Sequence, residues 1–423
     1  MTINIKTIFY LLFCRFLIDI LYYLISFKIY AYQGYSADIE LYISNLPISL
    51  FFIIPFIFND NRSTVSSYLV FILLIGILLP LSTLYAFGST PFVWYIINLF
   101  AFIFIVLINN AISNIDIDIP SLSNFTVFKL IFYSFYTVSI FLFLTKYGLD
   151  INISNFSLTS ELIYNQRSYF KDSNPGYLIL NFFTLGPPLL FAYSVIYKTR
   201  FLTIISFLLT IIIFSTSSEK SLLFSMVLYA GIIFVHKLYS KIQQTDLIKG
   251  YILMILSASS IYFFNSILSA LFINRLIFTP QLVATFYYEY FQKYDYSYFL
   301  DTSIFSLIFG KSYHTNIAKE LGRSFFGDET NLNAGLIADG YSKFGIIGVF
   351  IVCIVFIMIL KIIDIFSKNK NTLFIKLLMT YSVFTMINSS IFTVFFTSGL
   401  FLSLIFLILL PLDNKELKFI YEK

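Results

Sequence analysis

The sequence predicts an all-α polytopic membrane protein with about twelve transmembrane helices and two large loops on one side of the membrane, both containing short helices. Hydrophobic residues make up 59% of the chain and charged residues only 12%. The apolar residues form runs that can cross about 30 Å of hydrocarbon. Two polar excursions, at about 148–176 and 275–343, interrupt these runs.

The apolar runs leave no room for a separate soluble domain, so we expect one integral membrane domain over residues 1–423. The predicted spans cover residues 7–30, 40–58, 65–86, 91–112, 125–147, 177–197, 201–215, 221–238, 250–274, 344–366, 373–394 and 397–412.

Basic residues indicate the orientation, because Lys and Arg concentrate in short cytoplasmic loops. With twelve spans, both termini and most basic residues fall on the same side, which we therefore predict to be cytoplasmic. These residues are Lys6, Arg62, Lys198, Arg200, Lys237, Lys241, Lys249, Lys361, Lys368, Lys370, Lys415, Lys418 and Lys423. Lys146 and Lys220 are the exceptions. Both polar excursions then emerge on the outer side.

The composition argues against several classes of site. Cys14 and Cys353 lie in apolar runs, so neither a disulfide framework nor a cysteine metal site is expected. His236 and His314 fall on opposite sides of the predicted membrane, which excludes a His-rich zinc site. The net charge of +5 is modest, and no phosphate-binding or dinucleotide motif occurs. We therefore expect no metal, no cofactor and no nucleic-acid partner.

The first outer loop and a nearby turn carry candidate phosphate ligands. Arg167 and Lys171 are one helical turn apart, before a turn at 174–176. Because Arg binds phosphate oxygens bidentately, they could clamp a lipid-linked pyrophosphate; otherwise the loop only contacts water and headgroups. Lys220 lies on the outer side against the charge rule, which favours a ligand. Its alternative is a local pair with Glu219, worth less than about 1 kcal/mol.

The second outer loop combines cations with carboxylates. The cations are Arg275, Lys311, His314, Lys319 and Arg323, and the carboxylates are Asp301, Glu320, Asp328, Glu329 and Asp339. A glycosyl transfer from a lipid pyrophosphate needs cations to stabilise the leaving group and a base for the attacking hydroxyl. His314 is the first candidate base, since histidine has a pKa of about 6.5. Asp328 or Glu329 is the second, and a purely hydrogen-bonding His314 is the alternative.

Two helices are predicted within the second loop from a spacing of four residues. An amphipathic helix that lies in the membrane interface is indicated by Leu282, Phe286, Tyr290 and Tyr294. A polar stripe on a helix that continues into the tenth span is indicated by Asn331, Gly335, Asp339 and Lys343. We count Asn331 and Asp339 among the candidate substrate-binding residues.

Charged residues elsewhere have simpler interpretations. Arg15 and Asp19 are one helical turn apart in the first span. An unpaired charge there costs roughly 2.5–3.5 kcal/mol, so we predict that they neutralise each other; a polar cavity for substrate passage is the alternative. The string Asp116-Ile-Asp118 lies in a short cytoplasmic turn without room for a nucleotide-binding fold. Asp38 and Glu40 are only a weak match to a pair of metal-binding acids.

The late part of the second loop resembles a known family. The stretch FGDETNLNAGLIADGYSKFGIIGVFI, preceded by IFGKSYHTNIAKELGR, is similar to the end of the large periplasmic loop in bacterial O-antigen and capsule polymerases of the Wzy type. The likeness in sequence is concentrated at about 310–351, whereas the likeness in helix number and loop placement extends over the whole chain.

The resemblance implies a metal-independent glycosyltransferase of the bacterial inner membrane. It would polymerise undecaprenyl-pyrophosphate-linked oligosaccharide repeat units on the periplasmic face into O-antigen or capsular polysaccharide. Membrane lipid, a chain-length regulator and a flippase of the same pathway are the implied partners. Family arginines occur in an Arg-x10-Gly pattern, from which this chain departs: eight residues separate Arg167 from Gly176, and eleven separate Arg323 from Gly335.

Two other functions fit parts of the pattern. The O-antigen ligase also has about twelve spans and a large late periplasmic loop with arginines and a histidine, and His314 suits it. A lipid-linked oligosaccharide flippase or other transporter performs no bond chemistry and usually shows short loops with intramembrane charges or internal repeats. Here the intramembrane charge is sparse and the outer loops are rich in charge.

Overall fold

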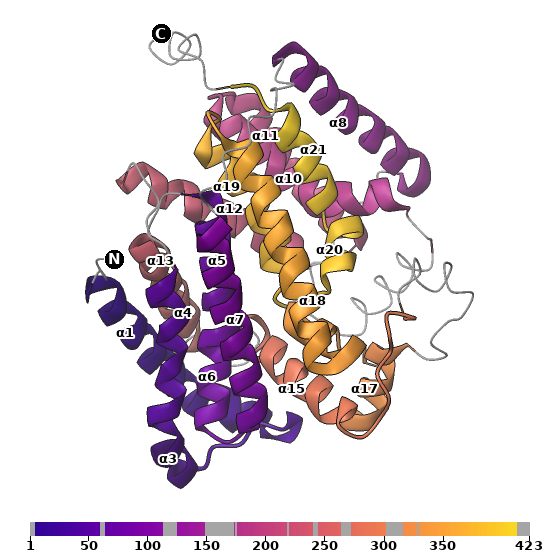
Figure 1. Ribbon diagram of the computed structural model, residues 1–423. Coiled ribbons are helices and arrows are strands. Elements are labelled where there is room, and N and C mark those ends of the chain that lie inside the picture. The colour runs from indigo at the N-terminus through magenta and orange to yellow at the C-terminus, as the bar shows by residue number, and fades with distance from the viewer. Residues whose placement is uncertain are drawn as a thin grey trace. The chain divides into compact units, whose positions relative to one another are not determined.

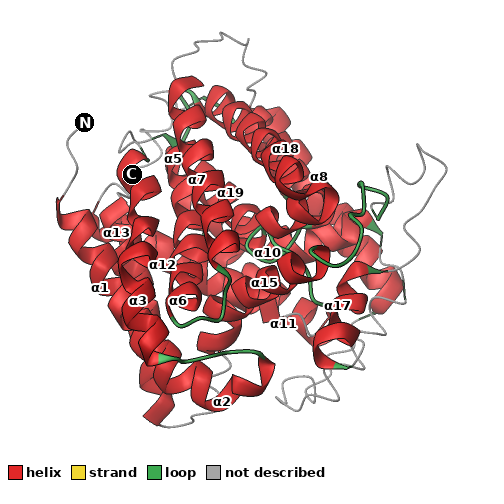
Figure 2. Cartoon of the chain, turned by 60° about the horizontal axis from the view of Figure 1, so that its bottom comes forward, coloured by secondary structure: helices red, strands yellow, loops and turns green. Residues whose placement is uncertain are grey.

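The computed structural model describes residues 5–59, 64–112, 125–148, 173, 176–217, 220–239, 244–263, 272–301, 316–327 and 330–412. The regular elements in these ranges are all helices (Figure 2). The chain divides into two compact units. Unit 1 comprises residues 1–115, 241–361 and 384–391, and unit 2 comprises residues 116–240, 362–383 and 392–423.

Figure 1 labels the principal helices of both units. Unit 1 contains α1 (Ile5–Leu21), η1 (Tyr22–Phe27), α2 (Lys28–Tyr30), η2 (Ala31–Gln33), α3 (Ile39–Ser49), η3 (Leu50–Phe52), α4 (Ile53–Phe58), α5 (Val65–Leu73), η4 (Leu74–Leu78), α6 (Leu79–Ala86), α7 (Phe92–Ile112), α13 (Gln244–Ser260), η6 (Ile261–Phe263), η7 (Asn274–Phe278), α15 (Thr279–Phe291), α17 (Ile317–Phe326) and most of α18 (Leu336–Ser367). Unit 2 contains α8 (Phe125–Tyr147), α10 (Tyr177–Ile196), α11 (Arg200–Ser217), α12 (Lys220–Tyr239), the end of α18, most of α19 (Thr372–Thr385) and α20 (Ile391–Thr397), and α21 (Leu400–Leu409).

Eight continuous helices in the described ranges are long and apolar enough to cross a membrane, and the bent pair α20–α21 would make nine. They are Ile5–Gln33, Ile39–Phe58, Val65–Ala86, Phe92–Ile112, Phe125–Tyr147, Tyr177–Ile196, Arg200–Ser217 and Leu336–Ser367. These are the lengths and compositions of a multi-pass membrane protein. They coincide with predicted spans one to seven and ten, and the full number of twelve stays a prediction.

Side-chain caps explain where several helices begin. The Asp38 carboxylate accepts a hydrogen bond from the Leu41 backbone N–H (3.0 Å) at the start of α3. Thr64 accepts one from the Ser67 N–H (3.3 Å) at the start of α5. Each cap satisfies a backbone donor that has no partner within its helix. Asp38 therefore has a local structural role that accounts for its position.

Unit 1 contains π-helical segments that leave backbone carbonyls without their usual α-helical partners. Gly76 lies in one of them, η4, and its carbonyl accepts a hydrogen bond from the buried side chain of Gln281 on α15 (3.3 Å). A Cβ atom at Gly76 would lie 2.2 Å from the Ile387 side chain. The glycine therefore lets the Ile387 side chain pack closely against this helix.

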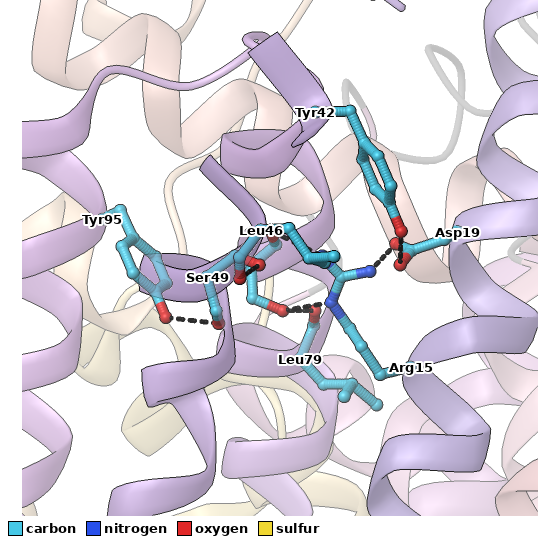
Figure 3. Close-up of polar contacts among 8 residues, drawn as sticks. Arg15, Asp19, Tyr42, Leu46, Ser49, Leu79 and Tyr95 are labelled. Carbon is cyan, nitrogen blue, oxygen red and sulfur yellow. Dashed lines mark hydrogen bonds and ion pairs between the residues drawn. The ribbon is translucent and has the colours of Figure 1, made fainter. Parts of the chain in front are cut away.

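The predicted pairing of Arg15 with Asp19 is confirmed, and it belongs to a larger buried network (Figure 3). Arg15 is 1% exposed. Its Nε donates to Ser82 Oγ (2.8 Å) and its NH2 group to the Ser82 carbonyl (3.0 Å). The Tyr42 hydroxyl donates to Asp19 (3.0 Å). Three helices, α1, α3 and α6, are thus joined through one ion pair with ordered partners, which fits a structural role.

Removing one member of this ion pair should destabilise the protein more than removing both charges. Arg15→Met alone leaves Asp19 buried without its counter-charge, at an expected cost of about 3–5 kcal/mol. Arg15→Met combined with Asp19→Asn should recover a large part of that cost. The measurement is thermal unfolding of the purified variants in detergent. Equal destabilisation by the single and double variants would contradict the structural role.

In unit 2, one asparagine fixes the bend between α20 and α21. The Asn181 amide on α10 donates to the carbonyls of Tyr177 and Phe396 (2.7 Å each), and its oxygen accepts from the Gly399 N–H (2.8 Å). Gly399 has φ +86°, which favours glycine, and the two helices meet at 60°. Backbone groups exposed by the bend therefore find partners within the unit, as an apolar environment requires.

A buried lysine caps α21. The Lys370 amine donates to the carbonyls of Leu407 (2.7 Å) and Ile408 (3.1 Å) at the C-terminal end of that helix, where a cation interacts favourably with the helix dipole. Burial acts in the opposite direction and lowers the pKa of Lys370 to about 8.

The stability contributed at Lys370 should therefore depend on pH. The folded state releases this proton near pH 8, whereas the unfolded chain holds it to about pH 10.4. Between these values the unfolded state binds more protons, so the free energy of unfolding rises with pH. Thermal unfolding of the wild type, measured relative to Lys370→Met, should show this rise from pH 8 to 10. A stability difference between the wild type and Lys370→Met that stays constant or falls over this pH range would contradict the prediction.

Candidate functional site

Helix α15 is the buried support of the candidate site. Its polar residues Gln281 and Thr285 are as buried as Leu282 and Phe286. The prediction of an amphipathic helix lying in the membrane interface is therefore wrong. The four-residue spacing identified one apolar face, but helices of unit 1 also pack against the other face.

Helix α17 packs on α15 and begins and ends at clear signals. Asn316 caps its N-terminus by accepting from the Lys319 N–H (3.3 Å), and Gly327 closes it with φ +74°. The ring of Phe325 stacks on Phe286 of α15 with centroids 4.3 Å apart. A Cβ atom at Gly322 would lie 2.1 Å from the Thr330 carbonyl, so the glycine lets the following segment pass close to the helix.

Helix α18 starts beside α15 and α17 and bends sharply after two turns (Figure 1). Phe344 and Gly345 have non-helical backbone angles, with φ +61° and ψ −137° at Gly345. Beyond the bend, Gly348 lies so close to Gly340 that a Cβ atom on it would be 2.0 Å from the Gly340 carbonyl. Eight residues of straight helix would rise about 12 Å, so the bend brings the two segments together.

The predicted polar stripe on this helix is correct in its second half. Asp339 and Lys343 form an ion pair (3.2 Å) in the first turns of α18. Asn331 and Gly335 precede the helix, which begins at Leu336. The reason is a contact with a distant segment: a Cβ atom at Gly335 would lie 2.2 Å from the Ile387 carbonyl, and the Leu336 N–H donates to the Met386 carbonyl (2.8 Å).

Lys343 joins two carboxylates. Its amine is bound by Asp339 and also donates to Asp301 Oδ2. The side chains of Lys343, Asp339 and Asp301 are 1%, 8% and 21% exposed. Asp339 Oδ2 is buried and accepts no hydrogen bond from the described residues. One buried amine thus holds two carboxylates, one of which keeps an oxygen for a further donor.

A short turn holds Asp301 in place. The N–H groups of Ser297 and Tyr298 donate to the carbonyls of Ser342 (2.9 Å) and Lys343 (3.1 Å), at the point where α18 bends. The Ser297 hydroxyl donates to Asp301 Oδ1 (3.0 Å). Tyr298 and Phe299 have positive φ angles of 51° and 65°, which are uncommon for residues with side chains. The bend in α18 therefore both releases these carbonyls and positions Asp301.

The side chains of Lys343, Asp339 and Asp301 are here called the ion cluster. Tyr287 interacts electrostatically with this cluster and forms a hydrogen bond with the segment before α18. Its hydroxyl donates to the Leu332 carbonyl (2.9 Å). Burial, together with the negative charges of Asp339 and Asp301, raises the pKa of Tyr287 above its ordinary value. One turn along α15, the Tyr290 hydroxyl donates to Glu320 on α17 (3.4 Å). Helix α15 thus interacts electrostatically with Asp339 and Asp301 and contacts α17 directly.

The other predicted site residues are distributed as follows. Arg323 is more than half exposed and lies 3.9 Å from Glu320. Asn331 is exposed. Arg275 is exposed in η7 and interacts electrostatically with Tyr30 rather than with the ion cluster. Lys220 begins α12 in unit 2. Outside the described residues lie His314, Asp328, Glu329, Arg167, Lys171, Lys311 and the Asp116–Asp118 string.

Sequence reasoning missed the importance of Asp301 and Lys343. The sequence places Asp301 among several carboxylates of the second outer loop and Lys343 at the end of the polar stripe, and it predicts neither as a site residue. The spacing of Asp339 and Lys343 signals their pairing. No comparable local signal exists for Asp301, which is separated from Lys343 by 42 positions.

No family model, curated protein or solved structure matches the chain.

Gly345 should be necessary for the shape of the site. Gly345→Ala forces a side chain into a backbone conformation that favours glycine, and its Cβ would lie 2.7 Å from the Tyr296 hydroxyl. We expect a loss of about 1–3 kcal/mol in unfolding free energy. Gly231→Ala is the matched control, because Gly231 is helical with open space around it. Thermal unfolding in detergent measures both, and equal stability of the two variants would refute the role of Gly345.

Proposed function

We propose that this protein is an inner-membrane glycosyltransferase that polymerises undecaprenyl-pyrophosphate-linked oligosaccharide repeat units into O-antigen or capsular polysaccharide. The proposal includes twelve spans, cytoplasmic termini and a periplasmic location for residues 275–343. Its support is the resemblance at 310–351 together with the residues gathered around the first turns of α18. A chain-length regulator and a flippase of the same pathway are the expected partners.

The proposal rests mainly on one observation. Two carboxylates, Asp301 and Asp339, share the amine of Lys343, and helix α17 of the same unit carries cations. Asp301 is the most exposed of the three charged groups, so it is the carboxylate that a substrate can reach. Lys343 and Asp339 lie behind it and hold it in position. On α17, Arg323 and Lys319 supply positive charge within the same unit.

In the proposed reaction, the hydroxyl at the non-reducing end of the acceptor repeat unit attacks the anomeric carbon of the donor chain. A new glycosidic C–O bond forms, and the bond from that carbon to the pyrophosphate oxygen breaks. The hydroxyl proton passes to Asp301, which acts as general base. The electron pair leaves with undecaprenyl pyrophosphate, whose negative charge Arg323 and Lys319 stabilise.

This mechanism differs from the expectation from sequence in its choice of base. Asp301 is the base in this proposal because Ser297 and Lys343 hold it at the bend of α18 and it is the more exposed carboxylate of the pair. His314, Asp328 and Glu329 lie outside the described residues, and their roles stay predictions. Arg323 keeps its proposed role as a pyrophosphate ligand, and Asp339 becomes a positioning residue that holds the Lys343 amine.

The test compares variants in a strain that lacks the gene. The wild-type gene should restore a ladder of surface glycans on a gel, whereas the empty strain should show a core bearing a single repeat unit. Asp301→Asn should lower polymer formation by a factor of about 10²–10⁴, as expected for loss of a general base. Arg323→Gln should also shorten or remove the ladder.

Matched controls remove the same charges from the neighbouring surface. Asp295 and Lys293 are exposed residues that follow α15, and Asp295→Asn and Lys293→Gln should leave the ladder intact. Immunoblots of membranes confirm equal amounts of each variant. Full-length polymer from Asp301→Asn would refute the assigned base. Loss of even the first repeat in the empty strain, with lipid-linked polymer accumulating, would instead identify the ligase.

A further inference from the structure

Charge is distributed unequally between the two units. In unit 1 the described acidic and basic residues are nearly balanced. Over the full sequence, unit 2 contains fourteen Lys and Arg residues against ten Asp and Glu residues, whereas unit 1 contains thirteen against twelve. The cations in the described ranges of unit 2 are Lys129, Lys146, Lys198, Arg200, Lys220, Lys237, Lys368, Lys370 and Lys376. An excess of one sign on a compact body attracts a partner of the opposite sign.

Most of these cations gather at one end of unit 2. The start of α8 meets the end of α10 through Phe125 and Tyr197, with ring centroids 6.0 Å apart. It meets the start of α19 through Phe128 and Phe374 at 6.3 Å. Three residues separate the end of α10 from the start of α11, and His236 near the end of α12 interacts electrostatically with Lys376. The cations at this end, here called the basic end, are Lys129, Lys198, Arg200, Lys237, Lys368, Lys370 and Lys376.

One of these cations occupies a position that helix electrostatics disfavours. Arg200 is the first residue of α11. The N-terminal end of a helix carries partial positive charge, so a cation there raises the energy of the folded protein. An anion bound at the basic end would offset this cost.

The surface next to the basic end is apolar and exposed. On α11, Phe201 and Ile204 follow Arg200 and are 73% and 59% exposed. On α12, Phe234 lies one turn before Lys237 and is 59% exposed. On α8, Leu130 follows Lys129 and is 67% exposed. Cations bordering apolar side chains match a ligand with an anionic headgroup and acyl chains. A free phosphate would use only the cations.

We propose that the basic end of unit 2 is a binding site for anionic phospholipids. The headgroup phosphate would contact Arg200, Lys237 and Lys129, and the acyl chains would lie along the exposed apolar faces of α8, α11 and α12. The proposal is independent of the glycosyltransferase activity, because it concerns charge and apolar surface in unit 2 alone. In the proposed topology the basic end faces the cytoplasmic leaflet.

The experiment uses the full-length protein purified in detergent, with phosphatidylglycerol, phosphatidylcholine or inorganic phosphate added. Bound lipid is counted by native mass spectrometry, and thermal unfolding is followed in parallel. Phosphatidylglycerol should bind the wild type about tenfold more tightly than phosphatidylcholine and raise its Tm, and this preference should weaken at high salt. Inorganic phosphate should not raise the Tm.

The decisive comparison is between two triple variants that remove the same charge. Lys129→Gln/Arg200→Gln/Lys237→Gln should lose the preference for phosphatidylglycerol. Lys6→Gln/Lys28→Gln/Lys293→Gln, which changes exposed lysines of unit 1, should retain it. An equal loss of the preference for phosphatidylglycerol in both triple variants would show that the total charge, rather than this site, attracts the lipid. An unchanged preference in the first variant, or equal stabilisation by phosphate, would also overturn the proposal. The two single variants Arg200→Gln and Lys237→Gln serve if the first triple variant does not fold.

Discussion

A buried amine held between two carboxylates is the interaction on which the candidate site depends. Lys343 is almost inaccessible, so its charge is tolerable only because Asp339 and Asp301 bind it. The same residue contributes its backbone carbonyl to the turn that carries Asp301. The bend at Gly345, the turn at 297–301 and the start of α18 are therefore parts of one arrangement. Changing any of them moves Asp301, the more exposed of the two carboxylates.

A wider rule connects this cluster with the rest of the molecule: polar groups in an apolar protein must find partners inside it. Arg15 binds the hydroxyl and carbonyl of Ser82, Gln281 binds the Gly76 carbonyl, and Lys370 binds carbonyls at the end of α21. In each case a side chain donates a hydrogen bond to a backbone carbonyl. The carbonyl lies where α-helical hydrogen bonding is interrupted or ends, or it accepts a second hydrogen bond. These contacts explain why charged residues occur deep in a chain that is otherwise so apolar.

The sequence predicts the parts of this structure that depend on local spacing. Apolar runs identify most of the long helices, and four-residue spacing identifies the pairs Arg15–Asp19 and Asp339–Lys343, because both lie on continuous helix. Residue spacing does not predict the structure where contacts between distant backbone segments determine where a helix begins or which faces it buries. The stripe stops at Gly335 because a distant carbonyl occupies the space of a side chain, and α15 is buried on both faces. Asp301 reaches Lys343 through a bend that no periodicity indicates.

In the proposed function, the protein makes glycosidic bonds between lipid-linked repeat units. The most direct test reconstitutes the purified protein in liposomes with one synthetic undecaprenyl-pyrophosphate oligosaccharide and no other protein. We expect products of increasing repeat number and release of undecaprenyl pyrophosphate, both abolished by Asp301→Asn. Movement of the intact substrate across the bilayer without any new bond would refute the proposed function and identify a transporter.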